Sequence, residues 1–114
     1  MWLCLNDAFF SIVTDRHDPS RLLVRARQVG DIERYFPQAA VEVGTGSDYL
    51  FRAYIDRQQV AAVIALAVED IHYDNFKNSV RDGARRRAYS QFWETMYQFQ
   101  ENNLDNKFGG EEKP

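Results

Sequence analysis

The sequence predicts an α+β fold, with an antiparallel sheet of about five strands and two to three C-terminal helices packed on one face. Two observations carry this prediction. Short aromatic and β-branched segments dominate the first half of the 114-residue chain, and apolar residues at helical spacing dominate the second half. Strands that precede the helices in the order βββ, short α, ββ favour antiparallel pairing.

The first two strands are predicted to form a hairpin. Segments 2–5 and 9–13 are rich in aromatic and β-branched residues, and the Asn-Asp pair between them tolerates the positive φ of a tight turn. Residues 16–20 follow as a loop, because Pro19 lacks a backbone N–H and biases the residue before it away from helix.

The third strand is predicted over residues 22–27 from its alternation of side chains. Val24 and Ala26 face one side, which we expect to be the core, while Arg25 and Arg27 face the other. The arginines of this strand are therefore expected to lie in water.

A short helix is predicted over residues 31–36, where Asp31 serves as the cap and Pro37 ends the helix. Two further strands follow at 40–43 and 49–55, separated by a glycine-containing turn. The residues predicted to share the core face of the later strand are Tyr49, Phe51, Ala53 and Ile55.

A long helix is predicted to start at Asp56, which matches a capping box with Gln59. Its surface is apolar nearly all round, so we expect the sheet to cover one side and the final helix another. Its apolar stripe comprises Val60, Val63, Ile64, Ala67, Val68 and Ile71.

A short helical piece is predicted over residues 74–80, and a last helix runs from Ala84 to about Gln100. We expect residues 1–101 to form a single α+β domain and residues 102–114 to form a flexible polar tail. The aromatic face of the last helix comprises Tyr89, Phe92, Met96 and Phe99, with Trp93 and Tyr97 beside it.

Bulk composition narrows the class of protein. The hydrophobic fraction of 45% and the charged fraction of 27% are near the globular average. Cys4 is the single cysteine, which excludes an internal disulfide. No apolar run approaches the roughly 20 residues that span a bilayer, and the N-terminus has no basic leader. We therefore expect a cytoplasmic protein that has no membrane partner.

Neither a metal site nor a cofactor is predicted. Asp15, His17 and Asp18 share one loop and carry oxygen and imidazole ligands, but such residues are common in surface turns. The chain also lacks the nucleophile elbow, the Walker loop and the paired-cysteine motifs that mark catalysis. A small enzyme that uses His72, Asp74 and His17 stays open as the third hypothesis.

Two basic features are candidate binding sites. The first is a sheet face, because alternation predicts that Arg25, Arg27, Arg52 and Tyr54 point away from the core. Such a face can bind phosphates and stack bases, and it can equally be an ordinary solvated surface.

The second basic feature is the triplet formed by Arg85, Arg86 and Arg87. If the last helix starts near Gly83, the triplet opposes the helix dipole, and a partner could explain its presence. The interpretation that we favour is a helix running through from Asp74, which would place the triplet in mid-helix without that cost.

The stretch Tyr73 to Val80, followed by Tyr89 and Trp93, has a recognisable pattern. With the segments Trp2-x-x-Leu5-Asn6 and Leu22 to Arg27, it resembles a group of small uncharacterised bacterial and bacteriophage proteins. These proteins share a Y-x-N-F-K-x-x-V stretch that precedes a Y-x-x-x-W helix. The resemblance implies no activity and no site residues, but it implies a bacterial or mobile-element setting.

The leading hypothesis is therefore a small non-catalytic binding protein that occludes a surface of a host protein or complex. It could be an inhibitor or an anti-defence, anti-CRISPR-like factor of a phage or mobile element. Small size, the lack of a catalytic signature, and the abundance of aromatic residues and arginines motivate this hypothesis. The alternative is a nucleic-acid or nucleotide binder that uses the basic sheet face. A homodimer is also open, through the apolar residues around Trp93 and Tyr97.

Overall fold

The computed structural model describes residues 1–44 and 46–104 of the chain. The chain divides into two compact units, Met1–Asn75 and a second unit that begins at Phe76. The single domain expected over residues 1–101 stays a prediction, because the compactness of each unit does not decide whether they share an interior. Most of the predicted polar tail, from residue 105 onward, lies outside the described residues.

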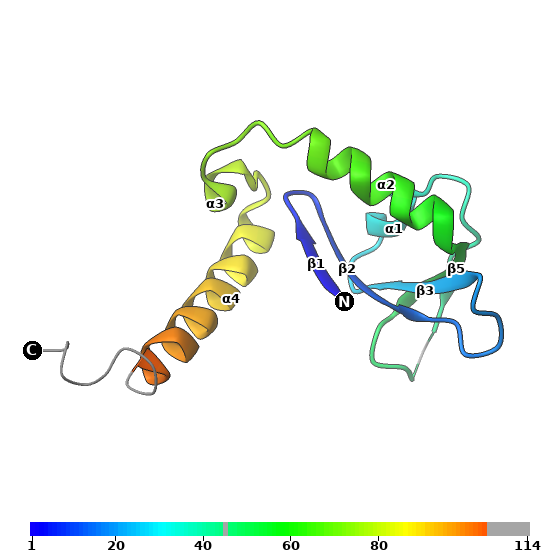
Figure 1. The fold of residues 1–114 in the computed structure, drawn as a ribbon, viewed down its shortest axis with the longest axis horizontal. Helices are drawn as coiled ribbons and strands as arrows, with labels where there is room; N and C mark the ends of the chain where they lie inside the picture. Colours follow the sequence, from blue (N-terminus) through cyan, green and yellow to red (C-terminus); the bar gives the residue numbers. More distant parts are fainter. Residues whose placement is uncertain (45, 105–114) are drawn as a thin grey trace, which may run out of the picture. The chain divides into compact units, whose positions relative to one another are not determined.

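An antiparallel five-stranded sheet forms the centre of the first unit, as Figure 1 shows. Its strand order is β1-β2-β3-β5-β4, and each neighbouring pair is antiparallel. The strands are β1 (Trp2–Leu5), β2 (Ala8–Thr14), β3 (Arg21–Ala26), β4 (Glu42–Val43) and β5 (Phe51–Asp56). The helices are α1 (Asp31–Tyr35), α2 (Arg57–Glu69), α3 (Phe76–Ser79) and α4 (Gly83–Asn102). The predicted α+β class is therefore confirmed.

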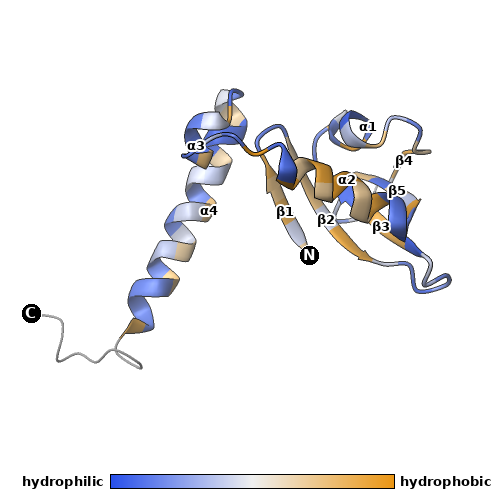
Figure 2. Ribbon diagram, turned by 45° about the horizontal axis from the view of Figure 1, so that its top comes forward, coloured by the Kyte–Doolittle hydropathy of each residue, from blue (hydrophilic) through white to orange (hydrophobic). Residues whose placement is uncertain are grey.

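One face of the sheet packs against α1 and α2 and forms the core. Alternation along β3 turns Val24 and Ala26 inward, where both are fully buried, and Ala53 of β5 lies opposite Val24. Figure 2 shows apolar residues concentrated in β2, β3 and α2. The buried core cluster contains Ala8, Phe10, Ile12, Val24, Ala26, Ile32, Phe36, Ala53, Ile55 and Val60.

Helix α1 begins differently from the prediction. Its N-cap is Gly30, whose φ of 91° lies in the left-handed region that glycine adopts at little cost, and no side chain caps the helix. Asp31 is not the cap. Its buried carboxylate accepts a hydrogen bond from the backbone N–H of Phe9 at 3.1 Å. This hydrogen bond ties α1 to β2 and gives the partly buried Phe9 N–H an acceptor.

Helix α2 begins where capping rules predict. The Asp56 carboxylate accepts from the backbone N–H of Gln58 at 3.1 Å and from that of Gln59 at 3.3 Å. Val60 is buried in the core, whereas Val68 is exposed. The first unit therefore covers only part of this stripe, and cover of its other side by the final helix stays a prediction. None of the described helices is long and apolar enough to cross a membrane.

The second unit contains α3 and α4. Asp82 caps α4, since its carboxylate accepts from the Arg85 backbone N–H at 2.8 Å. Asp82 itself has extended dihedral angles, which break the chain from the helical path before Gly83. The favoured interpretation of one helix running from Asp74 is therefore wrong, and the arginine triplet lies in the first turns of α4. Tyr89 is buried and stacks on Phe76 with ring centroids 5.5 Å apart.

Truncation of Phe10 tests this assignment of the core. Phe10 is 1% exposed and packs edge-to-face on Phe36, so Phe10→Ala is expected to lower the free energy of unfolding by about 3–5 kcal/mol. Urea denaturation measures this loss. Val29→Ala is the matched control, because Val29 is 73% exposed and its truncation should change stability by less than about 0.5 kcal/mol. Equal effects of the two substitutions would contradict the assignment.

Candidate functional site: an arginine pocket on the sheet

A pocket of about 370 Å³ lies on the sheet beside the loop that joins β2 to β3. It opens on the face opposite the core, because its strand residues alternate with buried core residues such as Val24 and Ala53. We call it the arginine pocket, and it is lined by Val13, Thr14, Asp15, Arg16, His17, Leu23, Arg25, Arg52 and Tyr54.

Strand register places two arginines side by side in this pocket. Arg25 of β3 pairs directly with Arg52 of β5, and Arg25 also lies opposite Ser11 of β2. Like charges directly opposite each other destabilise a sheet. The sequence predicted that these arginines share one face, and the structure brings them together.

Both arginines are more buried than predicted. Arg25 donates from Nη2 to the Ser11 hydroxyl at 2.8 Å, and its guanidinium lies 4.7 Å from the centre of the Tyr49 ring. The Nε atoms of Arg25 and Arg52 are buried, and neither donates to any acceptor among the described residues. The prediction that these side chains lie freely in water is wrong, because neighbouring side chains cover their stems. Two positively charged side chains thus line the pocket, and each has a buried Nε donor without an acceptor among the described residues.

The carboxylate that lines the pocket, Asp15, is already engaged. Asp15 is buried and accepts from the His17 backbone N–H at 2.9 Å and from Arg21 Nη2 at 2.7 Å. The hydrogen bond from His17, followed by that from Arg21, holds the pKa of Asp15 below its usual value. Because Arg21 balances the charge of Asp15, this carboxylate does not neutralise the paired arginines.

The loop that contains Asp15 is held by internal hydrogen bonds. Asp18 accepts from the Ser20 hydroxyl at 2.7 Å and from the Ser20 backbone N–H at 3.0 Å. These bonds, the one from the hydroxyl first, lower the pKa of the Asp18 carboxyl. Within residues 1–44 and 46–104, no group of three or more side chains is arranged to hold a metal ion. Of the cluster Asp15, His17 and Asp18, the first two line the pocket, and the hydrogen bonds of Asp15 and Asp18 hold the loop.

Arg27 and Tyr54 occupy different places around the pocket. Arg27 forms an ion pair with Asp48 at 3.3 Å and lies 3.9 Å above the centre of the Tyr49 ring, outside the pocket lining. Tyr54 lines the pocket, and the guanidinium of Arg21 lies 4.9 Å from its ring centre. Arg27 therefore has a structural partner, whereas Tyr54 forms an exposed edge of the site.

Tyr49 is the residue whose role sequence reasoning missed. It was predicted to share the core face with Phe51, yet Arg25 and Arg27 both lie over its ring. Residues 47–50 bend before β5 begins at Phe51, so the alternation does not extend back to Tyr49. A buried tyrosine ring supports the arginines through cation–π contacts.

The arginine triplet belongs to the second unit and does not line the arginine pocket. Arg86 donates from Nε to the Val80 carbonyl at 3.0 Å, which helps to join the start of α4 to the segment before it. Arg86 and Arg87 are exposed, and Arg85 is partly buried. These three residues therefore form a basic feature of the second unit.

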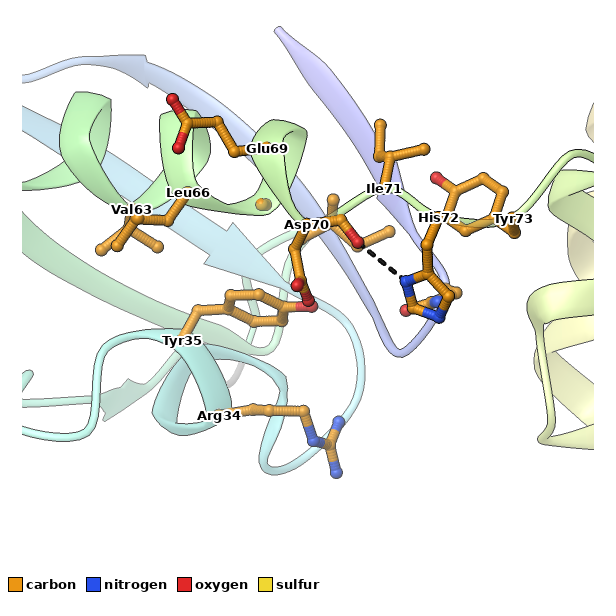
Figure 3. Close-up of a pocket in the computed structure, with 12 residues that line it drawn as sticks. Arg34, Tyr35, Val63, Leu66, Glu69, Asp70, Ile71, His72 and Tyr73 are labelled. Carbon is orange, nitrogen blue, oxygen red and sulfur yellow. Dashed lines mark hydrogen bonds between the residues drawn. The ribbon is translucent and has the colours of Figure 1, made fainter.

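The proposed catalytic histidines do not converge. His17 lines the arginine pocket, near the start of α2, where the Arg57 backbone N–H bonds to the Ser20 carbonyl at 2.8 Å. His72 follows the other end of α2, which has 13 residues and a length of about 20 Å. There His72 lines a second pocket of about 610 Å³, and its Nδ1 is 2.9 Å from the Asp70 carbonyl, as Figure 3 shows.

Comparison of the chain with protein-family models, curated proteins and solved structures gave no match. Inferences about the arginine pocket therefore depend on its own structure.

Acid titration tests the role of Asp15. Because its folded-state pKa is lowered, Asp15 stabilises the fold above the unfolded value of about 3.9 and loses this effect as pH falls through the folded-state pKa. We expect Asp15→Asn to be less stable than the native chain at neutral pH and to lose less further stability below about pH 4. Urea midpoints at several pH values measure this. Glu33→Gln, which removes an exposed carboxylate, is the control, and the same acid dependence in Asp15→Asn and the native chain would contradict the role.

Replacement of Arg52 tests whether the paired arginines strain the free protein. Arg52→Met keeps the apolar stem and removes the charge opposite Arg25, so we expect it to raise the free energy of unfolding by about 0.5–2 kcal/mol. Arg27→Met is the control, because it breaks the ion pair with Asp48 and should cost up to about 1 kcal/mol. A loss of stability in Arg52→Met would show that Arg52 stabilises the fold.

Proposed function

We propose that this chain is a small non-catalytic binding protein that captures an acidic side chain of a partner protein in the arginine pocket. The observation that carries the proposal is the opposition of Arg25 and Arg52, whose buried Nε atoms lack an acceptor. A carboxylate placed between them would accept from both guanidinium groups and neutralise their repulsion.

The energetics favour an ionised ligand. A hydrogen bond to a charged group contributes about 1.5–3 kcal/mol, and the planar guanidinium group matches a carboxylate in geometry. The Ser11 hydroxyl and the Tyr49 ring hold Arg25 before the ligand arrives, so little entropy of this side chain remains to be lost on binding. Arginine is also among the residue types that dominate binding energy at protein interfaces.

The surroundings of the pocket favour a single anionic group over a nucleic-acid backbone. Asp15 and Asp18 lie on the loop beside the pocket, and Glu42 pairs with Arg52 in the sheet. A strand of phosphates would have to pass these carboxylates, and the whole chain carries a net charge of −3. The positive charge is therefore confined to the pocket. A pocket of this kind suits a single aspartate or glutamate side chain of a partner protein, whose surface the chain would then occlude.

Binding of an acidic probe tests the proposal. We expect a short glutamate-rich peptide to shift the NMR signals of the Nε–H groups of Arg25 and Arg52, because their protons would gain an acceptor. Arg25→Ala combined with Arg52→Ala should weaken binding of the peptide by about tenfold or more. Adding Arg27→Ala to this pair tests the whole predicted face, and circular dichroism should show that each variant is folded.

Arg81→Ala is the matched control, because Arg81 is exposed and lies outside the pocket lining. It removes one positive charge and should leave binding unchanged. Unchanged binding in the double variant, or equal loss in the control, would overturn the proposal.

The nucleic-acid alternative has one observation in its favour, the exposed ring of Tyr54 at the edge of the pocket, on which a base could stack. It predicts binding of a single-stranded oligonucleotide, with an affinity that falls steeply with salt in proportion to the number of phosphates contacted. One captured carboxylate predicts a shallow dependence on salt. A gel-shift series at low and high salt separates the two functions, and a steep oligonucleotide response would replace the protein-binding proposal.

A further inference from the structure

The arginine pocket contains one histidine, His17, whose backbone is held and whose ring is not. The His17 backbone N–H donates to the Asp15 carboxylate at 2.9 Å, which fixes this part of the loop. The side chain lines the pocket and is exposed. Among residues 1–44 and 46–104, the imidazole has no hydrogen bond or ion pair, so it is available to a ligand in the pocket.

The His17 ring lies close to the carboxylate that shares the pocket with it. The His17 backbone N–H lowers the pKa of Asp15 most, the Arg21 side chain follows, and the charge of the His17 ring lowers it further. Both oxygens of Asp15 are already occupied, Oδ1 by the His17 backbone and Oδ2 by Arg21. An anionic ligand in the pocket would therefore give the ring an acceptor that Asp15 does not supply.

Histidine is also the residue type that changes charge near neutral pH. Its side chain does so between about pH 5 and 8, whereas arginine and tyrosine titrate well above this range. Hydrogen bonds hold the pKa values of the Asp15 and Asp18 carboxyls below their usual values, so both stay ionised. The charged and titratable groups that line the pocket with His17 or bond to its loop are Asp15, Arg16, Asp18, Arg21, Arg25, Arg52, Tyr54 and Arg57.

We propose that His17 is a third ligand-binding residue of the arginine pocket, and that its protonated ring donates a hydrogen bond to the acidic side chain captured by Arg25 and Arg52. This inference rests on the proposed function and adds its regulation by pH. A bound carboxylate favours the charged form of a neighbouring imidazole, so binding takes up a proton. Because the coupling of the two events is reciprocal, affinity rises as pH falls through the range in which histidine titrates.

The pH dependence of peptide binding tests this inference. Calorimetric titration with the glutamate-rich peptide should give an affinity about two- to fivefold higher at about pH 5.5 than at about pH 7.5, the effect expected of one exposed ion pair. His17→Gln should remove this gain, because an amide stays neutral at both pH values. His72→Gln is the matched control and should keep the gain, since the chain has only two histidines and His72 lines the other pocket.

NMR of the native chain provides a second measurement that requires no substitution. At about pH 6.5, the peptide should move the imidazole signals of His17 towards those of the charged ring and leave those of His72 in place. Binding with equal affinity at both pH values, or an equal gain in His17→Gln and the native chain, would overturn this inference and leave the proposed function intact. A peptide that binds at neither pH would overturn both.

Discussion

The pairing register of β3 and β5 is the constraint on which the rest of the first unit depends. Val24 and Ala53 must face the helices to be buried, and the two-residue period of a strand then forces Arg25 and Arg52 onto the opposite face as direct neighbours. A slip of one residue would bring arginine into the core, so the arrangement that builds the core also creates the charged pair. The sheet tolerates this repulsion because the apolar side fixes the register more strongly than the charges oppose it. Residues that destabilise a fold locally, without being needed to form it, are typical of a functional site.

The contacts of Arg25 and Asp15 limit how the side chains around the arginine pair can move to reduce the repulsion. Arg25 is held between the Ser11 hydroxyl and the Tyr49 ring, so it cannot swing away from Arg52 without losing both contacts. Asp15 cannot move towards the pair because Arg21 binds its carboxylate and the backbone of His17 anchors it. For the anion binding that we propose, fixing Arg25 in this way would reduce the entropic cost. The same contacts explain why Asp15 does not occupy the site itself.

Much of the fold was predictable because its signals are local. The hairpin of β1 and β2 and the cap of α2 at Asp56 depend on residues within a few positions of each other. The partner of Asp31 was not predictable, since the backbone N–H of Phe9 is 22 positions away in sequence and meets it only through tertiary packing. The sequence indicated which arginines share a face, but the direct opposition of Arg25 and Arg52 depends on the pairing of two strands that are not consecutive. The start of α4 could have been predicted from the sequence. Asp82 before a glycine is an N-cap signal that outweighs the helical periodicity further upstream.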